Sequence, residues 1–493
     1  MGIIQKQGLR NAIILSVGIV IGFANVLLSP RILTAEQYGL LSILNTVAIL
    51  FVQFASLGLP NVVAKYLAQY KQQNYAGFLA WVTQMAAICF ALFLLVYFLF
   101  QKPVATFYNQ KSPLFVSYYL HLIPLVLFTF VFNLLEILAR GFYQSVFATV
   151  LREPFLKTTN LLGLMLFAFG WISFDTLIWI YIASNGMMCL LLLLQLYTCK
   201  AIVFQQVKKI DYGASRQMLS YGMHLFLASI AWVVLNKIDL LFIGQKVGLA
   251  AGGIYAYYTL WASLIRLPTN AINRISYQLV ADAWVVQDVK KINEVYEKTS
   301  MVQMTIGLLI FIGIALNKHN IIAIIGDKNG YAAYFDLFYI IGASVLIDVT
   351  GGLNAQIVML SHRYKIASVF SFMALFICVV ANYVLIRYVG LSGAAWALLI
   401  TLFGYNFFNW YYIKRQFNMQ PFGNKYFVLL LIACFVFIIV FYTPLMFNYF
   451  IDLVLRSLLI ILIYGSAVIY FNISDDITLY GKKCWAKAKQ YRL

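Results

Sequence analysis

The sequence predicts an all-α polytopic membrane protein with about fourteen transmembrane helices, arranged as two six-helix lobes followed by two extra helices. Three observations lead to this prediction. The 493-residue chain is 63% hydrophobic and only 10% charged, and its mean hydropathy is +0.86, values outside the range of soluble globular proteins. Its apolar residues form runs long enough to cross a bilayer at ~20 residues per helix. Lys and Arg concentrate in alternate connections between these runs.

Apolar runs bounded by charged or turn residues define the individual spans. They are 11–29, 39–59, 78–100, 117–138, 156–173, 177–198, 218–243, 252–273, 301–317, 336–360, 366–386, 391–412, 427–447 and 453–471.

Basic residues predict which side of the membrane each connection faces. Starting with Lys6 and Arg10, alternate segments carry most of the 35 Lys and Arg, and the last of them is the tail from Lys482 to Arg492. Positively charged loops stay in the cytoplasm, so both termini are predicted to be cytoplasmic. The run after Arg10 is too long for a signal peptide and no small-residue cleavage site follows it, so it is interpreted as the first span.

Two proline-containing segments indicate an internal repeat. Leu57-Gly58-Leu59-Pro60-Asn61 and Leu264-Ile265-Arg266-Leu267-Pro268-Thr269-Asn270 each interrupt or end an apolar run. Proline removes a backbone donor and kinks a helix, so each half is predicted to contain a broken helix with Pro60 or Pro268 at its hinge. We therefore expect lobes at 1–210 and 211–420, related as parallel repeats, and then two extra helices and a basic cytoplasmic tail at 421–493.

Composition and motifs exclude several functions. The net charge of +19 is spread through short loops and forms no basic face, which argues against nucleic-acid binding. The chain has no nucleotide-binding P-loop motif, its four histidines fall in four different segments, and its six cysteines form no C-x-x-C pair. We expect no enzyme activity, no metal site and no cofactor.

Five short motifs carry a resemblance to a known family. They are Pro-x-x-Leu-Thr-x-Glu-x-Tyr-Gly (Pro30 to Gly39), Gly58-Leu59-Pro60, Arg140-Gly141-x-x-Gln144, Asp239 ahead of Gly253-x-Tyr255, and the turn from Gly390 to Ala395. In this order they resemble the Wzx-type oligosaccharide (O-antigen or polysaccharide) flippases of the multidrug/oligosaccharidyl-lipid/polysaccharide (MOP) superfamily. The resemblance covers essentially the whole chain and implies a MATE/MOP-like fold.

Arg266 and Asp348 are the deepest charges in the predicted spans. A guanidinium costs ~2.5–3.5 kcal/mol at mid-membrane, so Arg266 should face a watery cavity or a partner. It either binds a phosphate of the substrate in a cavity or forms a structural ion pair. Asp348 either pairs with Arg266 or takes up a proton during transport.

Further candidates for the cavity are polar residues in other spans. Asp239 matches the family's recurring acidic position, which suggests a cavity-lining or gating role, whereas Lys237 points elsewhere on the helix and is favoured to snorkel outward. Arg140 is expected in an i,i+4 pair with Glu136, and it begins a cytoplasmic cluster with Arg152 and Lys157 that can meet an anionic headgroup. Asp452 and Arg456 fit the same spacing and are interpreted as structural.

Three uncharged residues of early spans, Asn25, Asn45 and Gln53, either line a sugar-binding cavity or hydrogen-bond neighbouring helices. The second use is the commoner one.

The resemblance implies a flippase for undecaprenyl-diphosphate-linked oligosaccharide in a bacterial cytoplasmic membrane, serving the synthesis of a polysaccharide such as lipopolysaccharide O-antigen. Its partners would be that lipid-linked oligosaccharide and membrane lipids, and other membrane proteins of polysaccharide assembly are further candidate partners. The sequence indicates no coupling ion. Before residue 136 the only carboxylate is Glu36, which favours an anionic cargo over the cationic drugs of a multidrug exporter, the main alternative. A membrane glycosyltransferase or polymerase would need a large extramembrane loop, and none is predicted.

Overall fold

The computed structural model describes residues 3–142, 144–202, 210–326, 330–363, 365–445, 448–474 and 478. Every regular element within these ranges is a helix, which confirms the predicted all-α class. The chain forms two compact units, Met1–Gly253 and Ile254–Leu493. The division into lobes at residues 210 and 420 is inferred from the internal sequence repeat, and it stays a prediction. The basic tail predicted at 482–492 lies outside the described residues.

The first unit is a helical bundle. Its helices are α1 (Ile3–Ile32), α2 (Ala35–Ser56), α3 (Leu59–Gln73), α4 (Tyr75–Asn109), α5 (Pro113–Ser117), α6 (Leu122–Gly141), α7 (Ser145–Val150), α8 (Leu156–Ala168), α9 (Phe174–Thr198) and α10 (Tyr212–Lys246), with the start of α11 (Leu249–Ser263). A 3₁₀ turn, η1 (Tyr119–His121), precedes α6, and a π-helical stretch, η2 (Leu151–Phe155), joins α7 to α8.

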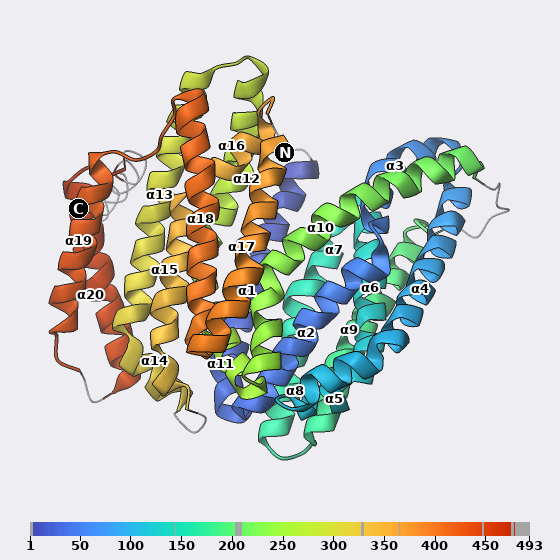
Figure 1. Cartoon of the computed structure of the whole chain (residues 1–493), viewed down its shortest axis with the longest axis horizontal. Helices are drawn as coiled ribbons and strands as arrows, with labels where there is room; N and C mark the ends of the chain where they lie inside the picture. Colours follow the sequence, from blue (N-terminus) through green and yellow to red (C-terminus); the bar gives the residue numbers. More distant parts are fainter. Residues whose placement is uncertain are drawn as a thin grey trace, which may run out of the picture. The chain divides into compact units, whose positions relative to one another are not determined.

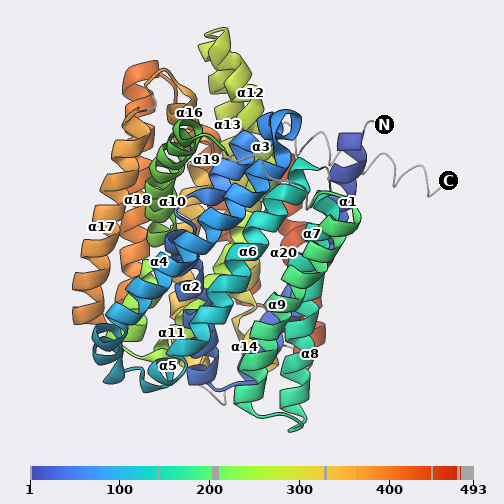
Figure 2. The same cartoon turned by 90° about the vertical axis from the view of Figure 1, so that its right-hand side faces the viewer.

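Helix α2 is the centre of this unit. It contacts α4, α6 and α10, while α6 contacts α9 and α1 contacts α8 (Figure 2).

Two glycines of the family motifs let α2 meet the start of α11 closely. A Cβ on Gly39 would lie 1.9 Å from the carbonyl oxygen of Leu249, and a Cβ on Gly253 would lie 2.8 Å from the Gly39 nitrogen. These motif glycines therefore serve close helix packing, as small residues do at membrane helix interfaces.

The second unit contains the remaining helices. They are α12 (Leu267–Val285), α13 (Val289–Leu316), α14 (Lys318–Ile325), α15 (Asp336–Thr350), α16 (Asn354–Leu360), α17 (Lys365–Val389), α18 (Leu391–Phe417), α19 (Asn424–Phe441) and α20 (Tyr449–Tyr470), with 3₁₀ turns η3 (Leu264–Arg266) and η4 (Ala332–Tyr334). Helices α13, α15, α18 and α17 pack side by side in that order (Figure 1).

The two extra helices, α19 and α20, pack on α13. Their shared core includes Met304 and Leu308 of α13, Val436 of α19, and Ile460 and Tyr464 of α20. These two helices therefore share a hydrophobic core with α13.

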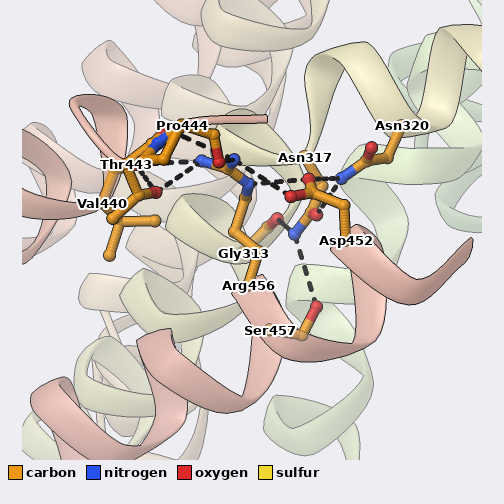
Figure 3. A network of polar contacts seen from close by, with 9 residues as sticks. All are labelled: Gly313, Asn317, Asn320, Val440, Thr443, Pro444, Asp452, Arg456 and Ser457. Atoms are coloured by element: carbon orange, nitrogen blue, oxygen red, sulfur yellow. Dashed lines mark hydrogen bonds and ion pairs between the residues drawn. The ribbon is translucent and has the colours of Figure 1, made fainter. Parts of the chain in front are cut away.

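A buried polar network fixes α20 to α14 and to the end of α19 (Figure 3). Arg456 Nε donates to Asp452 Oδ2 at 3.0 Å, and its two terminal nitrogens donate to the carbonyl oxygens of Val440, Thr443 and Pro444. Asn320 Nδ2 of α14 donates to the same Asp452 oxygen at 2.6 Å. The side chains of Asp452 and Arg456 are only 4% and 5% exposed, so the i,i+4 pair interpreted as structural does lie in the packed interior.

The predicted count of fourteen spans is not confirmed. Within the described ranges, ten helices are long and apolar enough to cross a membrane, or up to twelve if each of two bent pairs counts as one span. The predicted span 156–173 contains α8, which has 13 residues and continues backwards into a segment carrying Arg152 and Glu153. The predicted span 252–273 is divided by η3 into α11 and α12. Hydropathy registers apolar content but does not register such backbone breaks.

Candidate functional site

Arg266 lies in a 3₁₀ turn that joins two α-helices of the second unit. Helix α11 ends at Ser263, the residues Leu264–Arg266 form the 3₁₀ turn η3, and α12 starts at Leu267. Pro268 stands in the first turn of α12, where its missing N–H costs no helical hydrogen bond. The chain can therefore place a charged residue and a proline in an apolar segment by ending one helix and beginning another.

Asp348 lies next to a bend between two helices. It is two residues before the end of α15 at Thr350, and α15 and α16 are bent by 42° relative to each other. Arg266 Nη2 is 2.9 Å from Asp348 Oδ2, so the structure joins the two deepest charges predicted from the sequence.

Two asparagines extend this ion pair into a four-residue network. Asn406 of α18 donates from Nδ2 to Asp348 Oδ1 at 3.2 Å, and Asn354 of α16 donates from Nδ2 to Asn406 Oδ1 at 2.9 Å. The Arg266 network, comprising Arg266, Asp348, Asn406 and Asn354, thus connects η3, α15, α18 and α16. One oxygen of Asp348 thus pairs with the Arg266 guanidinium, and the other accepts a hydrogen bond from Asn406.

The network is partly open and its hydrogen bonding is incomplete. The side chains of Arg266 and Asp348 are 34% and 30% exposed, whereas Asn354 and Asn406 are buried. Arg266 Nε is buried without a hydrogen-bond partner among the described residues. A guanidinium has five N–H donors, so this one retains donors for a further acceptor after pairing with Asp348.

Sequence reasoning missed both asparagines. Asn406 falls in the aromatic run from Tyr405 to Tyr412, and Asn354 follows Gly351 and Gly352, so neither lies near a charge along the chain. The sequence feature that could have identified them is an amide side chain within an apolar helix, because such an amide needs a hydrogen-bond partner there.

Lys237 and Asp239 belong to α10 of the first unit. Both are partly buried. Asp239 Oδ1 accepts a hydrogen bond from the backbone nitrogen of Leu240 at 2.8 Å. The roles expected for these two residues stay predictions.

The three early polar residues have different surroundings. Asn25 donates from Nδ2 to the carbonyl oxygens of Ile21 and of Lys157, at 3.1 and 3.0 Å, and so links α1 to α8. Asn45 is exposed and accepts a hydrogen bond from the hydroxyl of Tyr181 on α9 at 3.3 Å. Gln53 is partly buried. The contacts of Asn25 and Asn45 match the interhelical alternative.

Arg140 belongs to a charge-compensated cluster. Glu136, which is buried, pairs with Arg140 at 2.5 Å and with Arg152 at 2.7 Å. Lys157 pairs instead with Glu153 at 2.7 Å. The predicted cytoplasmic trio is therefore divided between two carboxylates. The Arg140 side chain nevertheless remains 62% exposed.

A neighbouring lysine packs against the same end of α6. Lys71 of α3 donates to the carbonyl oxygen of Gly141, and its Nζ lies 3.4 Å from the ring centroid of Phe142. Partial burial lowers the pKa of Lys71.

Pro60 resembles Pro268 in its position. Leu57 and Gly58 adopt left-handed conformations, with φ of 44° and 78°, and Pro60 stands in the first turn of α3. Both prolines named as hinges therefore stand in the first turn of an α-helix, Pro60 after two left-handed residues and Pro268 after a 3₁₀ turn.

The described residues hold no group of three or more His, Cys, Asp or Glu side chains placed to bind a metal ion.

Comparisons with known proteins agree with this architecture. The chain is similar to the lipid II flippase MurJ in an inward closed conformation, with a TM-score of 0.72 and 13% identity over 94% of this chain and 98% of that one. It is also similar to a multidrug resistance MATE family transporter of the MOP superfamily, inward-facing, with a TM-score of 0.64 and 10% identity over 83% of this chain and 98% of that one. These likenesses show the MurJ/MATE-like fold.

A search of curated proteins finds no match. The family model described as polysaccharide biosynthesis protein matches residues 9–280, which is more than half of the chain and confirms the resemblance based on the motifs. This multi-pass membrane chain therefore belongs to the polysaccharide biosynthesis protein family.

Proposed function

We propose that the protein is a flippase that moves undecaprenyl-diphosphate-linked oligosaccharide from the cytoplasmic to the outer leaflet of a bacterial cytoplasmic membrane, by alternating access. Both termini lie in the cytoplasm in this proposal, as the distribution of Lys and Arg predicts. The sugar assembled from this cargo is a polysaccharide of the O-antigen class.

Family membership and fold support a transporter, and the Arg266 network supports its anionic cargo. A permanent cation in an apolar segment costs ~2.5–3.5 kcal/mol, a cost that selection maintains only where the charge has a use. Arg266 is paired, but it is one-third exposed and keeps an unpartnered buried Nε. The proposal depends on this observation, that the guanidinium of Arg266 has hydrogen-bond donors left unused.

Arg266 and Asp348 would act together during the cycle. A diphosphate can replace the Asp348 carboxylate as the acceptor of Arg266 hydrogen bonds, because both groups offer paired anionic oxygens to the guanidinium. Arg266 lies in η3 and Asp348 lies beside the α15–α16 bend, so exchange of the acceptor would change the contacts at both places. The breaks beside Pro60 and Pro268 are the proposed bending elements.

Reconstituted vesicles test the proposal. Wild-type protein should translocate a lipid-diphosphate-linked oligosaccharide, measured by its exposure to a glycan-modifying enzyme on one side. Arg266→Ala should slow translocation at least about tenfold, equivalent to ~1.4 kcal/mol. Arg387→Ala is the matched control, since Arg387 is an exposed cation of the same unit. Equal rates for Arg266→Ala, Asp348→Ala and wild type would refute the assignment.

A multidrug exporter is the second candidate, favoured by the likeness to MATE transporters. It would extrude cationic dyes from the same vesicles and leave the lipid-linked sugar in place. Dye extrusion without glycolipid translocation would replace the flippase proposal.

A further inference from the structure

A second basic site lies in the first unit, between α3 and α10. A pocket of about 610 Å³ is lined there by Lys65 and Tyr66 of α3 and, from α10, by Gly213, Arg216, Gln217, Ser220, Tyr221 and His224. Its volume is within the ~300–1,000 Å³ range of small-molecule sites.

The charge of this α3–α10 pocket is uncompensated. Neither Lys65 nor Arg216 forms an ion pair with a described residue, and the lining contains no carboxylate. The neighbouring carboxylate, Asp211, caps α10 by accepting a hydrogen bond from the Gly213 nitrogen at 2.9 Å. The pocket therefore contrasts with the Arg140 cluster, whose two arginines share Glu136.

Aromatic rings hold Lys65 in place without using its N–H donors. Lys65 Nζ lies 3.9 Å from the ring centroid of Tyr221 and 5.2 Å from that of Tyr66, and these two rings meet edge to face. A cation–π contact attracts the ammonium but leaves its donors available to an anion. Tyr221, Gln217 and Ser220 add hydroxyl and amide donors to the same lining.

The walls of the pocket are fixed by close helix packing. The Cβ of any side chain at Gly58 would lie 2.0 Å from the Gly222 carbonyl oxygen, so α3 and α10 meet nearly backbone to backbone at that point. Beyond this contact, the pocket is lined on α3 by Lys65 and Tyr66, and on α10 by residues between Gly213 and His224. Trp81 of α4 donates from Nε1 to Ser215 Oγ at 2.8 Å and so ties the start of α10 to α4.

We propose that the α3–α10 pocket binds a phosphate-bearing ligand, with Arg216 hydrogen-bonding a phosphate and Lys65 supplying a second positive charge. Two cations without a carboxylate partner, lining one pocket with neutral donors around them, are suited to a diphosphate or to an anionic phospholipid headgroup. The proposal deepens the flippase function and rests on it for one source of the ligand. The distribution of Lys and Arg predicts that both residues lie on the cytoplasmic side, where the flippase would first meet its cargo.

Binding of inorganic pyrophosphate provides a direct test that needs no transport. The full chain is placed in nanodiscs of phosphatidylcholine and titrated by calorimetry. We expect binding to the wild type and at least about tenfold weaker binding to the double variant Lys65→Gln/Arg216→Gln. The control Lys290→Gln/Arg415→Gln removes the same charge at exposed positions and should bind as wild type does. The swap Lys65→Arg/Arg216→Lys keeps the charge and should retain binding, which guards against a folding artefact.

Competition then separates the two sources. If lipid-diphosphate-linked sugar added to the nanodisc suppresses pyrophosphate binding, the ligand of the pocket is the cargo headgroup. If phosphatidylglycerol suppresses it, the ligand is a phospholipid headgroup. Absence of pyrophosphate binding to the wild type, or equal binding to Lys65→Gln/Arg216→Gln, overturns the site. If the wild type binds pyrophosphate in this pocket but does not translocate the lipid-linked sugar, the site stands and only the proposed function is overturned.

Discussion

Arg266 and Asp348 join the 3₁₀ turn η3 to the end of α15 through one ion pair, in which Arg266 Nη2 lies 2.9 Å from Asp348 Oδ2. The pair is one-third exposed, so water screens it and its net contribution to stability is small. The proposed function assigns this pair to transport, and a structural ion pair is the alternative explanation.

A double-mutant cycle on this pair separates the two explanations. Arg266→Gln, Asp348→Asn and the double variant should each change the free energy of unfolding by less than about 1 kcal/mol, since both groups are screened. Translocation should fall at least about tenfold in each single variant, a loss of ~1.4 kcal/mol in transition-state stabilisation. Denaturant unfolding in detergent and vesicle translocation supply the two readouts. Large stability losses with unchanged transport would identify a structural ion pair.

Gly351→Ala should disturb the network without removing a charge. A Cβ at this position would lie 2.1 Å from Asn406 Oδ1 and 2.8 Å from Asn354 Nδ2, so the amide–amide hydrogen bond must open. We expect a loss of about 1–2 kcal/mol in unfolding free energy together with slower translocation. Gly465→Ala on α20 is the control, because no atom lies within 4 Å of its added Cβ, and it should be neutral or stabilising.

The buried pair of the extra helices should behave in the opposite way. Asp452→Ala leaves the Arg456 guanidinium buried and without its anion, which typically costs about 3–5 kcal/mol. Asp452→Leu combined with Arg456→Met removes both charges and should be less destabilising than Asp452→Ala alone. Thermal unfolding checks the order, with Glu294→Ala at an exposed helix pair expected to leave the unfolding temperature unchanged. An Asp452→Ala variant as stable as wild type would show that the network in Figure 3 contributes little.

Gly58→Ala should damage the first unit far more than Pro60→Ala. The new Cβ would meet the Gly222 carbonyl oxygen at 2.0 Å, and the φ of 78° disfavours any residue with a side chain. We expect a loss of about 2 kcal/mol or more, together with weaker pyrophosphate binding in the adjoining α3–α10 pocket. Pro60 only begins a helix, so its replacement by Ala should change stability by less than about 1 kcal/mol. Comparable stability of the two variants would contradict the packing assigned to Gly58.

The sequence by itself determined the all-α membrane class, the family and the two deepest charges. Hydropathy and the distribution of Lys and Arg are properties of single segments, so they can be read along the chain without knowing which helices touch. The Asp452–Arg456 pair was predictable for the same reason, because residues four apart lie on one face of a helix.

Only the tertiary structure decided which polar groups meet across helices. Asn406 reaches Asp348 from another helix, and Lys65 and Arg216 line one pocket because α3 and α10 pack closely at Gly58 and Gly222. No local pattern encodes such pairs, since they depend on how helix faces turn and how closely backbones approach. The structure likewise decided where apolar segments change direction or helix type, as between α15 and α16 and at η3, because the apolar content of a segment does not encode its backbone geometry.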